Sequence, residues 1–458
     1  MDTGFDTIGN ATLICYDPKP VLVTDPWIVG TPYFGSWALS HEIPPEQFEA
    51  IRHSQYVWVS HGHPDHLIQD SMNLLRDKTI LVPDHYGNRI FYGLKEQGYN
   101  VHVIKDKVWT KLSDHVRILC LSDYNQDATL LIDINGRLLV NMNDSSARGW
   151  MNFVRKTIKQ YPISFYLRLY GGEADMKNFF DEDGKRIPLT PKELAPPLGR
   201  DICNETEYMG TKYFIPFSSF HKLQRTDSVW LQQYVASPQD YAKGFCSETK
   251  QILPAFIRYD CMTDQWRAIQ PRETPNIVRD PAEFGDNWND TLERLDFVKA
   301  KRYFQAIEHL RGFLDFIRLR VGGQDHVIEL SQKHFNRGIT FEAPRNSLIM
   351  SIEQECFDDM LIGTFMKTTL HGRWATKSLY PDFSPYVAKY ADNGRAKTET
   401  ELKMYFEEYR RRMGTGGVID LFQHKIEQKS KNVFRSYVSE HSAFDNAVRK
   451  IYHRIRRS

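Results

Sequence analysis

Short apolar runs alternate with charged, amphipathic stretches along the first half of the chain. Runs of this length that end in polar or turn residues are typical of strands. Asn135-Gly136 separates two of them and is a strong signal for a tight β-hairpin. The pattern predicts strands at 11–16, 21–24, 57–60, 79–82, 101–104, 128–134, 137–141, 165–170 and 213–216. Strands with interspersed helices favour a two-sheet sandwich flanked by helices, which is an α+β arrangement.

The pattern changes from about Pro271 onwards. Charged amphipathic stretches predict helices at 296–312 and 398–413, and runs between them predict strands at 325–330 and 347–352. A chain of 458 residues is also too long for one ordinary hydrophobic core. We therefore expect a catalytic domain at 1–240, a connecting segment at 241–289 and a C-terminal α+β region at 290–458.

The composition is that of a soluble globular protein, with 41% hydrophobic and 26% charged residues. The formal net charge is +1, so no overall field would attract nucleic acid. No apolar run approaches the ~20 residues that a membrane span needs. The 6 Cys are far apart, without a CxxC pair, and no export signal opens the sequence. These features favour a cytoplasmic protein with reduced thiols and no membrane span.

The most informative segment is Ser60-His61-Gly62-His63-Pro64-Asp65-His66, which follows an apolar run. His61 and His63 are two positions apart in extended chain, so both rings can face one cation. Asp65 and His66 follow a turn and can face a second cation. Two cations ~3.5–4 Å apart can polarise a substrate from both sides. A polar loop that is rich in His by chance is the alternative, but three His and one Asp at this spacing strongly favour a metal site.

This HxHxDH pattern resembles the signature of the metallo-β-lactamase fold, an αββα sandwich. The upstream segments Gly9-Asn10-Ala11-Thr12 and Asp25-Pro26-Trp27 look like the opening hairpin of that superfamily. Within this superfamily, the sequence is most similar to the catalytic domain of the CMP-N-acetylneuraminate hydroxylase family, from about residue 9 to residue 235. The residues that carry this resemblance are Asp25-Pro26-Trp27-Ile28, Gly30, Trp37, His41-Glu42, Pro44-Pro45, Asp127-Ala128-Thr129 and Pro216-Phe217.

The resemblance implies further metal ligands from later strands. The family bridges its metals with an Asp after a hairpin, a place that Asp144 occupies, and adds a His after a late strand, for which His221 is the best candidate. A turn carboxylate and an exposed loop His are the respective alternatives. Zinc hydrolases of this fold have a third His where residues 121–127 contain none. Asp127 is the best substitute there and Asp123 the second, although Asp127 can equally cap the strand that follows it.

The favoured interpretation is a diiron oxygenase that hydroxylates a small polar substrate, such as a sugar, an N-acyl group or a nucleotide conjugate. The substrate class comes from the resemblance. Two imidazoles and one carboxylate with open positions are typical of iron that activates oxygen. Asp144 would bridge the irons, and Asp65 and Asp144 are the expected catalytic carboxylates. The resemblance also implies a substrate site at Trp27, Trp37, His41 and Glu42, although Glu42 can equally be a surface residue.

The hydroxylase family also carries a Rieske centre, which needs two Cys and two His ligands. No CxH or CxxH pair occurs in this sequence, so we expect electrons from a ferredoxin or reductase. The alternative is a dizinc hydrolase of a phosphoester, amide or lactone, in which a water with its pKa lowered towards ~7 attacks the substrate. The missing Rieske pattern favours the hydrolase, and the missing third His disfavours it.

A third class, a non-enzymatic binding protein with a degenerate site, conflicts with the complete HxHxDH motif. The segments 356–359 and 380–383 can cover the pocket or form a dimer contact, and the sequence leaves both open.

Overall fold

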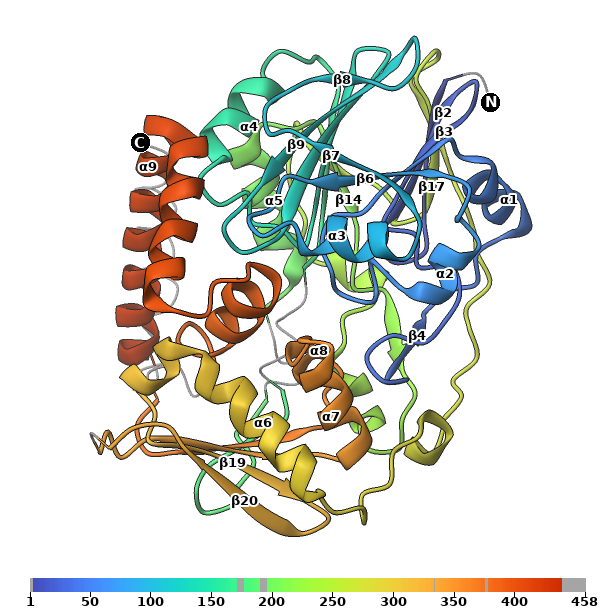
Figure 1. The fold of residues 1–458 in the computed structure, drawn as a ribbon. Helices are drawn as coiled ribbons and strands as arrows, with labels where there is room; N and C mark the ends of the chain where they lie inside the picture. Colours follow the sequence, from blue (N-terminus) through green and yellow to red (C-terminus); the bar gives the residue numbers. More distant parts are fainter. Residues whose placement is uncertain (1–2, 171–176, 190–195, 333, 375–377, 439–458) are drawn as a thin grey trace.

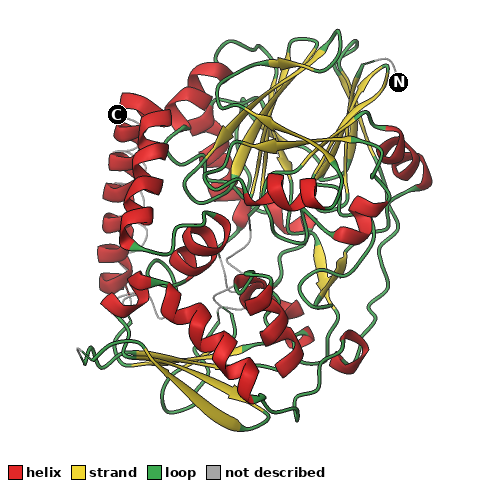
Figure 2. Ribbon diagram, in the orientation of Figure 1, coloured by secondary structure: helices red, strands yellow, loops and turns green. Residues whose placement is uncertain are grey.

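Two large mixed β-sheets stack face to face in one half of the molecule (Figures 1 and 2). The structure, a computed structural model, describes residues 3–170, 177–189, 196–332, 334–374 and 378–438, the last 18 of them by backbone alone. The first sheet contains, in spatial order, β18 (Gln265–Ala268), β17 (Ile257–Asp260), β1 (Gly4–Ile8), β2 (Thr12–Asp17), β3 (Lys19–Thr24), β5 (Tyr56–Trp58), β6 (Thr79–Pro83) and β7 (Asn100–Ile104). The second contains β16 (Gln251–Ile252), β14 (Tyr213–Pro216), β12 (Ser164–Arg168), β11 (Arg137–Asn143), β10 (Ala128–Ile134), β9 (Val116–Ser122) and β8 (Thr110–Lys111).

Both faces of each sheet are apolar. Along β2, Leu13 belongs to the core between the two sheets, and its neighbour Ile14 to the core beneath the outer helices. Along β10, Leu130 and Leu131 alternate in the same way. Successive strand residues point to opposite faces, so this pattern requires a layer on each side of both sheets.

Helices form the two outer layers. The first sheet is covered by α1 (Pro45–His53), α2 (Gln69–Asn73) and α3 (Arg89–Glu96), and the second by α4 (Met151–Ile158) and α5 (Leu198–Met209). In α4 the buried residues Val154 and Ile158 are four positions apart and therefore share the face that packs on the sheet. The helix–sheet–sheet–helix order confirms the predicted metallo-β-lactamase sandwich.

A separate sheet with its own core contains four strands from the second half of the chain and one, at residues 179–180, from the first half. Its strands, in spatial order, are β13 (Phe179–Phe180), β22 (Lys367–His371), β21 (Gly338–Glu342), β19 (Phe316–Val321) and β20 (Gln324–Glu329). The core beside it contains residues of α6 (Arg294–Ala306), α7 (Arg345–Glu353) and α8 (Asp358–Ile362). The remaining elements are β4 (Trp37–Leu39) paired with β15 (His221–Leu223), η2 (Val229–Tyr234), η3 (Pro238–Tyr241), η4 (Pro281–Phe284), η5 (Glu308–Gly312), the π-helix η6 (Pro385–Asn393) and α9 (Glu399–Val438).

One strand prediction in this half is wrong, because residues 347–352 lie in helix α7. A short apolar run does not by itself distinguish a strand from a buried helix. Here the buried residues are Ser347, Leu348, Ser351 and Ile352, which is the spacing of one helical face. The helix predicted at 398–413 is the first part of α9, whose backbone leaves helical geometry at Gly414. Strand 325–330 is present as β20.

Part of the expected connecting segment, 241–289, is strand. β16 pairs with β14 of the second sheet, and β17 pairs with β1 of the first. These residues are therefore integrated into the sandwich, and the domain limits at 240 and 290 stay a prediction.

One of the contacts between the C-terminal region and the sandwich runs through Arg225. The fully buried Arg225 guanidinium donates to Asp286 (2.7 Å) and to the carbonyl oxygen of Phe34 (2.9 Å). Asp286 in turn accepts from the backbone and hydroxyl of Ser347 on α7. Tyr405 makes another such contact, because Gln126 Nε2 of the sandwich donates to its hydroxyl at 3.1 Å. Within the C-terminal region, Gly394 at the end of η6 lies so close to the buried Tyr405 ring that an added Cβ would be 2.5 Å from it.

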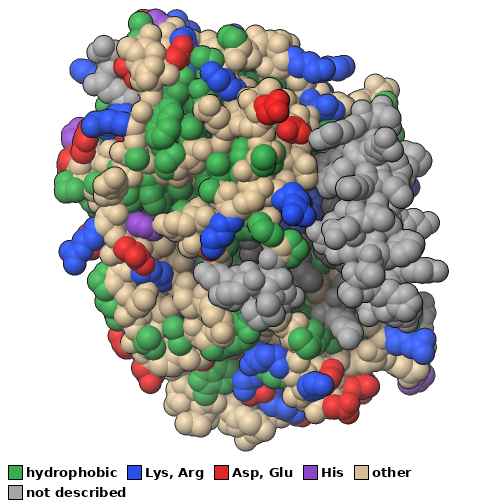
Figure 3. All heavy atoms as spheres, turned by 180° about the vertical axis from the view of Figure 1, so that it is seen from behind, with side chains coloured by type: hydrophobic (Ala, Val, Ile, Leu, Met, Phe, Trp, Pro, Cys, Tyr) green, Lys and Arg blue, Asp and Glu red, His purple; other side chains and the backbone are tan. Residues whose placement is uncertain are grey.

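The surface carries charges of both signs. On the face seen in Figure 3, Lys and Arg side chains are interspersed with Asp and Glu, consistent with a formal net charge of +1. Within the described ranges, no helix combines the length and the apolar character that crossing a membrane requires.

Candidate metal centre

The HxHxDH motif forms a loop directly after β5, at the carboxyl end of that strand. Ser60, the residue before the motif, is held in place by Asp25, which follows the neighbouring strand β3: Asp25 Oδ1 accepts from the Ser60 backbone N–H at 2.7 Å. A turn follows, in which His66 N–H donates to the His63 carbonyl oxygen (2.9 Å). Asp144 enters from the other sheet, at the end of β11. Strand ends of both sheets therefore meet at one place.

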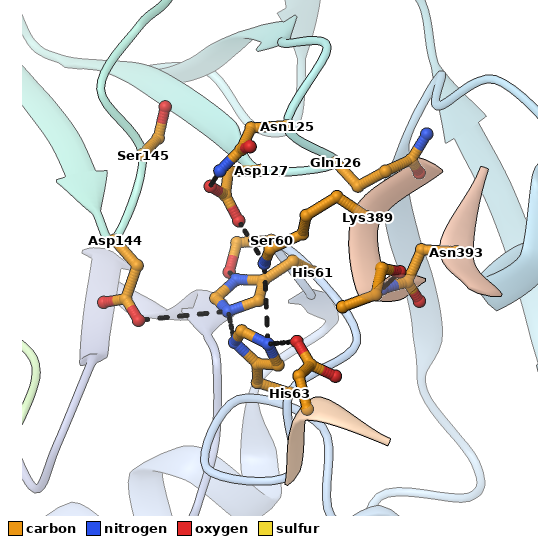
Figure 4. Close-up of polar contacts among 12 residues, drawn as sticks. Ser60, His61, His63, Asn125, Gln126, Asp127, Asp144, Ser145, Lys389 and Asn393 are labelled. Carbon is orange, nitrogen blue, oxygen red and sulfur yellow. Dashed lines mark hydrogen bonds and ion pairs between the residues drawn. The ribbon is translucent and has the colours of Figure 1, made fainter. Parts of the chain in front are cut away.

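A first group of candidate ligands comprises His61, His63 and Asp144 (Figure 4). His61 Nε2 lies 2.9 Å from His63 Nδ1 and 3.9 Å from Asp144 Oδ2. Two imidazole nitrogens and a carboxylate oxygen at this spacing can coordinate one transition-metal ion, with ligand bonds of about 2.0–2.2 Å.

A second group comprises Asp65, His66 and again Asp144. His66 Nε2 lies 3.4 Å from Asp65 Oδ2 and 3.5 Å from Asp144 Oδ2. This nitrogen is buried and makes no hydrogen bond that meets normal geometric criteria with any described residue. A buried imidazole nitrogen that faces two carboxylates without a good hydrogen bond fits a cation between them. Because Asp144 belongs to both groups, it occupies the place of a bridging ligand.

Further polar groups orient these ligands. Asp25 Oδ2 lies 3.2 Å and Ser60 Oγ 3.3 Å from His66 Nδ1, so a carboxylate and a hydroxyl face the ring nitrogen that is directed away from the candidate metal. Asp65 accepts hydrogen bonds from Asn10 Nδ2 (2.8 Å) and from the Tyr33 hydroxyl. Ser218 Oγ donates to Asp144 Oδ1 at 2.6 Å. The candidate ligands are thus fixed before any metal binds.

Charges in the site shift pKa values in opposite directions. Burial lowers the pKa of His61, and the neighbouring His66 and His63 lower it further. Burial would also lower the pKa of His66, but the carboxylates of Asp65, Asp144 and Asp25 outweigh it and raise that pKa well above the usual value. The three carboxylates therefore favour the charged form of His66, and a metal ion bound at this ring would take the place of one of its protons.

The C-terminal region contributes to the same place. Asp358, at the start of α8, lies with its Oδ2 3.1 Å from His63 Nε2. His63, Asp358 and Asp359 form a third group of candidate ligands. The buried Lys389 of η6 lies with its Nζ 3.5 Å from His63 Nε2 and 3.5 Å from Asp127 Oδ1.

Two predicted ligands are near the centre but outside these three groups. Asp127 accepts from Asn125 Nδ2 (3.1 Å) and faces the Lys389 ammonium. His221 is buried on β15 and stacks on Trp37, with ring centroids 3.4 Å apart. Burial is the main cause that lowers the pKa of His221 to about 3, so its ring is neutral. Their assignment as ligands stays a prediction.

The four residues predicted to bind substrate differ in their surroundings. Trp27 is fully buried, and Trp37 is 4% exposed beneath His221. His41 is half-buried, with its Nδ1 2.8 Å from Ser40 Oγ. Glu42 is exposed and lies 3.8 Å from Arg272. These contacts leave the substrate role of all four as a prediction.

Several residues that orient the site were not predicted from the sequence. Asn10 and Asp25 lie in segments that carried the family resemblance, so the signal was present without an assigned role. Tyr33 and Lys389 had no local signal. Asp358 belongs to a segment for which the sequence left open a cover over the pocket or a dimer contact, and its carboxylate lies 3.1 Å from the candidate ligand His63.

The αββα sandwich with an HxHxDH loop at its strand ends defines a protein of the metallo-β-lactamase fold. No protein-family model matches the chain. Cytidine monophosphate-N-acetylneuraminic acid hydroxylase of Danio rerio is 29% identical over 362 residues, which cover 69% of this chain and 58% of that protein. The hydroxylase of Sus scrofa is 26% identical over 132 residues, which cover 27% of this chain and 30% of that protein. The chain is homologous to these hydroxylases, which confirms the resemblance, and it spans less than two thirds of their length.

Solved structures are more distant. An isothiocyanate hydrolase from Delia radicum gut bacteria has 14% identity and a TM-score of 0.37, with 56% of this chain and 98% of that chain covered. CmlA, a diiron β-hydroxylase from Streptomyces venezuelae, has 12% identity and a TM-score of 0.34, with 58% of this chain and 54% of that chain covered.

Proposed function

We propose that the chain is the catalytic part of a dinuclear metal oxygenase that hydroxylates a small polar substrate. The observation that carries this proposal is the homology to hydroxylases over 69% of the chain. The names of those relatives describe a nucleotide-linked acidic sugar. The substrate class proposed for this chain is accordingly a sugar, an N-acyl group or a nucleotide conjugate.

Two metal ions would be held by His61, His63 and Asp144 on one side and by Asp65, His66 and Asp144 on the other. We favour iron, because two imidazoles and a carboxylate with open positions suit iron that reacts with oxygen. Iron would supply the redox chemistry of the overall reaction, in which R–H, O₂, two electrons and two protons give R–OH and H₂O.

The protein's own residues would prepare and shield the centre. Asp25 would keep the His66 proton on Nδ1, so that Nε2 stays free to coordinate. Burial of His61 and His66 would exclude water from the inner side of the centre. The Asp144 side chain is 24% exposed and that of His63 is 12% exposed, so substrate would approach from their side.

Electrons would come from outside the 458 residues, because the sequence contains no CxH or CxxH pair for a Rieske centre. A ferredoxin or a reductase would supply them. The same absence favours the second candidate, a dizinc hydrolase of a phosphoester, amide or lactone, which needs no electron donor.

The test is the metal content of protein produced with both iron and zinc available, followed by oxygen uptake after anaerobic reduction. CMP-N-acetylneuraminic acid serves as the probe substrate. Two irons per chain and substrate-stimulated oxygen uptake would support the oxygenase, and Asp144→Asn should abolish the uptake. The exposed carboxylate variant Asp114→Asn is the matched control and should retain it. Stoichiometric zinc without oxygen uptake would support the hydrolase, and protein without metal would refute both.

A further inference from the structure

The contact between His63 and Asp358 joins residues 295 positions apart. Both side chains are almost buried, at 12% and 11% exposure. Figure 4 shows His63 beside His61, and the two nitrogens of the His63 ring contact different groups: Nδ1 lies 2.9 Å from His61 Nε2 and Nε2 lies 3.1 Å from Asp358 Oδ2. The two ring nitrogens of one candidate ligand therefore face different parts of the chain.

The neighbours of His63 decide which ring nitrogen carries the proton. An ionised carboxylate only accepts hydrogen bonds, so an Asp358 oxygen at 3.1 Å from Nε2 calls for a proton on Nε2. Nδ1 then keeps its lone pair, and it faces His61 Nε2 at 2.9 Å. In the other tautomer the Nε2 lone pair would face the carboxylate, and only the more distant Lys389 ammonium, at 3.5 Å, could donate to it. The shorter contact favours the first tautomer.

Asp358 is also held firmly. Its neighbours Phe357 and Met360 are buried in the core of the C-terminal region. One residue beyond α8, the Gly363 carbonyl oxygen accepts from Ser36 Oγ at 2.6 Å. Helix α8 is therefore attached both to its own core and to the sandwich, so the carboxylate has little freedom to turn away from His63.

We propose that Asp358 is a positioning residue that holds His63 with Nδ1 directed at the metal, which makes the C-terminal region a structural part of the metal centre. This inference rests on the proposed dinuclear centre. It also assigns the group His63, Asp358 and Asp359 as support for that centre, without a third metal ion. The carboxylate–imidazole–metal arrangement is a general way to fix a ligand's tautomer and to raise its basicity.

The experiment measures zinc stoichiometry and affinity of the full chain by competition with a chromophoric chelator. Asp358→Ala should lower the affinity for one zinc ion by about 10–100-fold, which is the usual effect of losing such a hydrogen-bond partner of a ligand. Asp358→Asn keeps an acceptor oxygen of the same shape and should lose less than Asp358→Ala. Asp382→Ala removes a half-exposed carboxylate of the same region, one that pairs with Arg337, and is the matched control with unchanged affinity.

NMR of the ¹⁵N-labelled, zinc-loaded chain adds a readout that a purely structural role would not change. Nδ1 of His63 should show the shift of a metal-bound nitrogen and Nε2 a bound proton. Metal on Nε2, unchanged zinc affinity in Asp358→Ala, or a third zinc that both Asp358→Ala and Asp359→Ala remove would each overturn the inference. If the unmodified chain binds no metal, the proposed function fails as well, so the two failures are distinguishable.

Discussion

Asp25 offers a way to separate stability from metal binding. It is fully buried, accepts from the Ser60 backbone N–H at 2.7 Å and lies 3.2 Å from His66 Nδ1. Its backbone φ is 41°, in the left-handed region that Asn and Asp tolerate better than other residues with a Cβ. We compare Asp25→Asn, which keeps the shape and one acceptor oxygen, with Asp25→Ala, which keeps neither.

The expected effects on folding differ between the two variants. Asp25→Ala leaves the Ser60 N–H buried without a partner, which costs about 1–3 kcal/mol. Its left-handed backbone costs about 1–2 kcal/mol more. We therefore expect a loss of roughly 2–5 kcal/mol in the free energy of unfolding. Asp25→Asn avoids both costs and should stay within about 1 kcal/mol of the unmodified chain.

The expected effects on metal binding are similar for both. When the Asn oxygen faces Ser60, its amide NH₂ faces His66 Nδ1 and favours a proton on Nε2, the nitrogen needed for the metal. Both variants should lose about 10–100-fold in zinc affinity. Urea unfolding in the presence of chelator gives the stability, and competition with a chromophoric chelator gives the affinity. An Asp25→Asn chain that binds zinc within twofold of the unmodified chain would refute the reasoning, as would equal stability losses in both variants.

Three further predictions concern stability. Arg225→Met should lower the free energy of unfolding by about 3–5 kcal/mol in urea titrations, because it leaves the fully buried Asp286 without its cation; adding Asp286→Asn should recover part of the loss, and no recovery would contradict the pairing. Gly394→Ala should lower the free energy of unfolding by about 1–3 kcal/mol, because the added methyl group overpacks against a buried tyrosine ring. Gly93→Ala on α3 is the control, since its Cβ would meet open space and should not destabilise the chain. Equal shifts of the melting temperature in the two variants would contradict the prediction. Burial, as the main cause, raises the pKa of Asp392 to about 7, so the folded chain binds this proton more tightly than the unfolded chain. The contribution of this group to the free energy of unfolding should therefore fall by at most about 1.4 kcal/mol per pH unit from about pH 4 to 7. Asp392→Asn should remove this contribution, and an unchanged pH dependence of stability in that variant would contradict the prediction.

The local part of the site was accessible from the sequence. An apolar run followed by HxHxDH predicts where a strand ends and which side chains gather at its end, because spacing in extended chain decides which rings share a side. Asp144 was predicted because the family resemblance implies a bridging Asp after this hairpin, and in the structure Asp144 belongs to both groups of candidate ligands. His221 and Asp127 were placed near the centre by the same kind of argument.

Residues from distant segments could not be found in this way. The sequence left open whether the segment around Asp358 covers the pocket, and it gave no signal for Lys389. Their proximity to His63 depends on how the second core packs on the sandwich. The wrong strand prediction at residues 347–352 has a related cause. An apolar run of this length suits a strand and a helix equally, and packing within the second core decided for the helix.

The sequence by itself thus determined the sandwich and the central ligand motif, because both depend on periodicity and short spacing. Tertiary structure alone decided that a carboxylate and an ammonium group from the C-terminal region complete the surroundings of His63. The physical reason is that hydrogen bonds and ion pairs depend on distances of a few ångströms in space, and contacts between residues about 300 positions apart leave no mark on local sequence patterns.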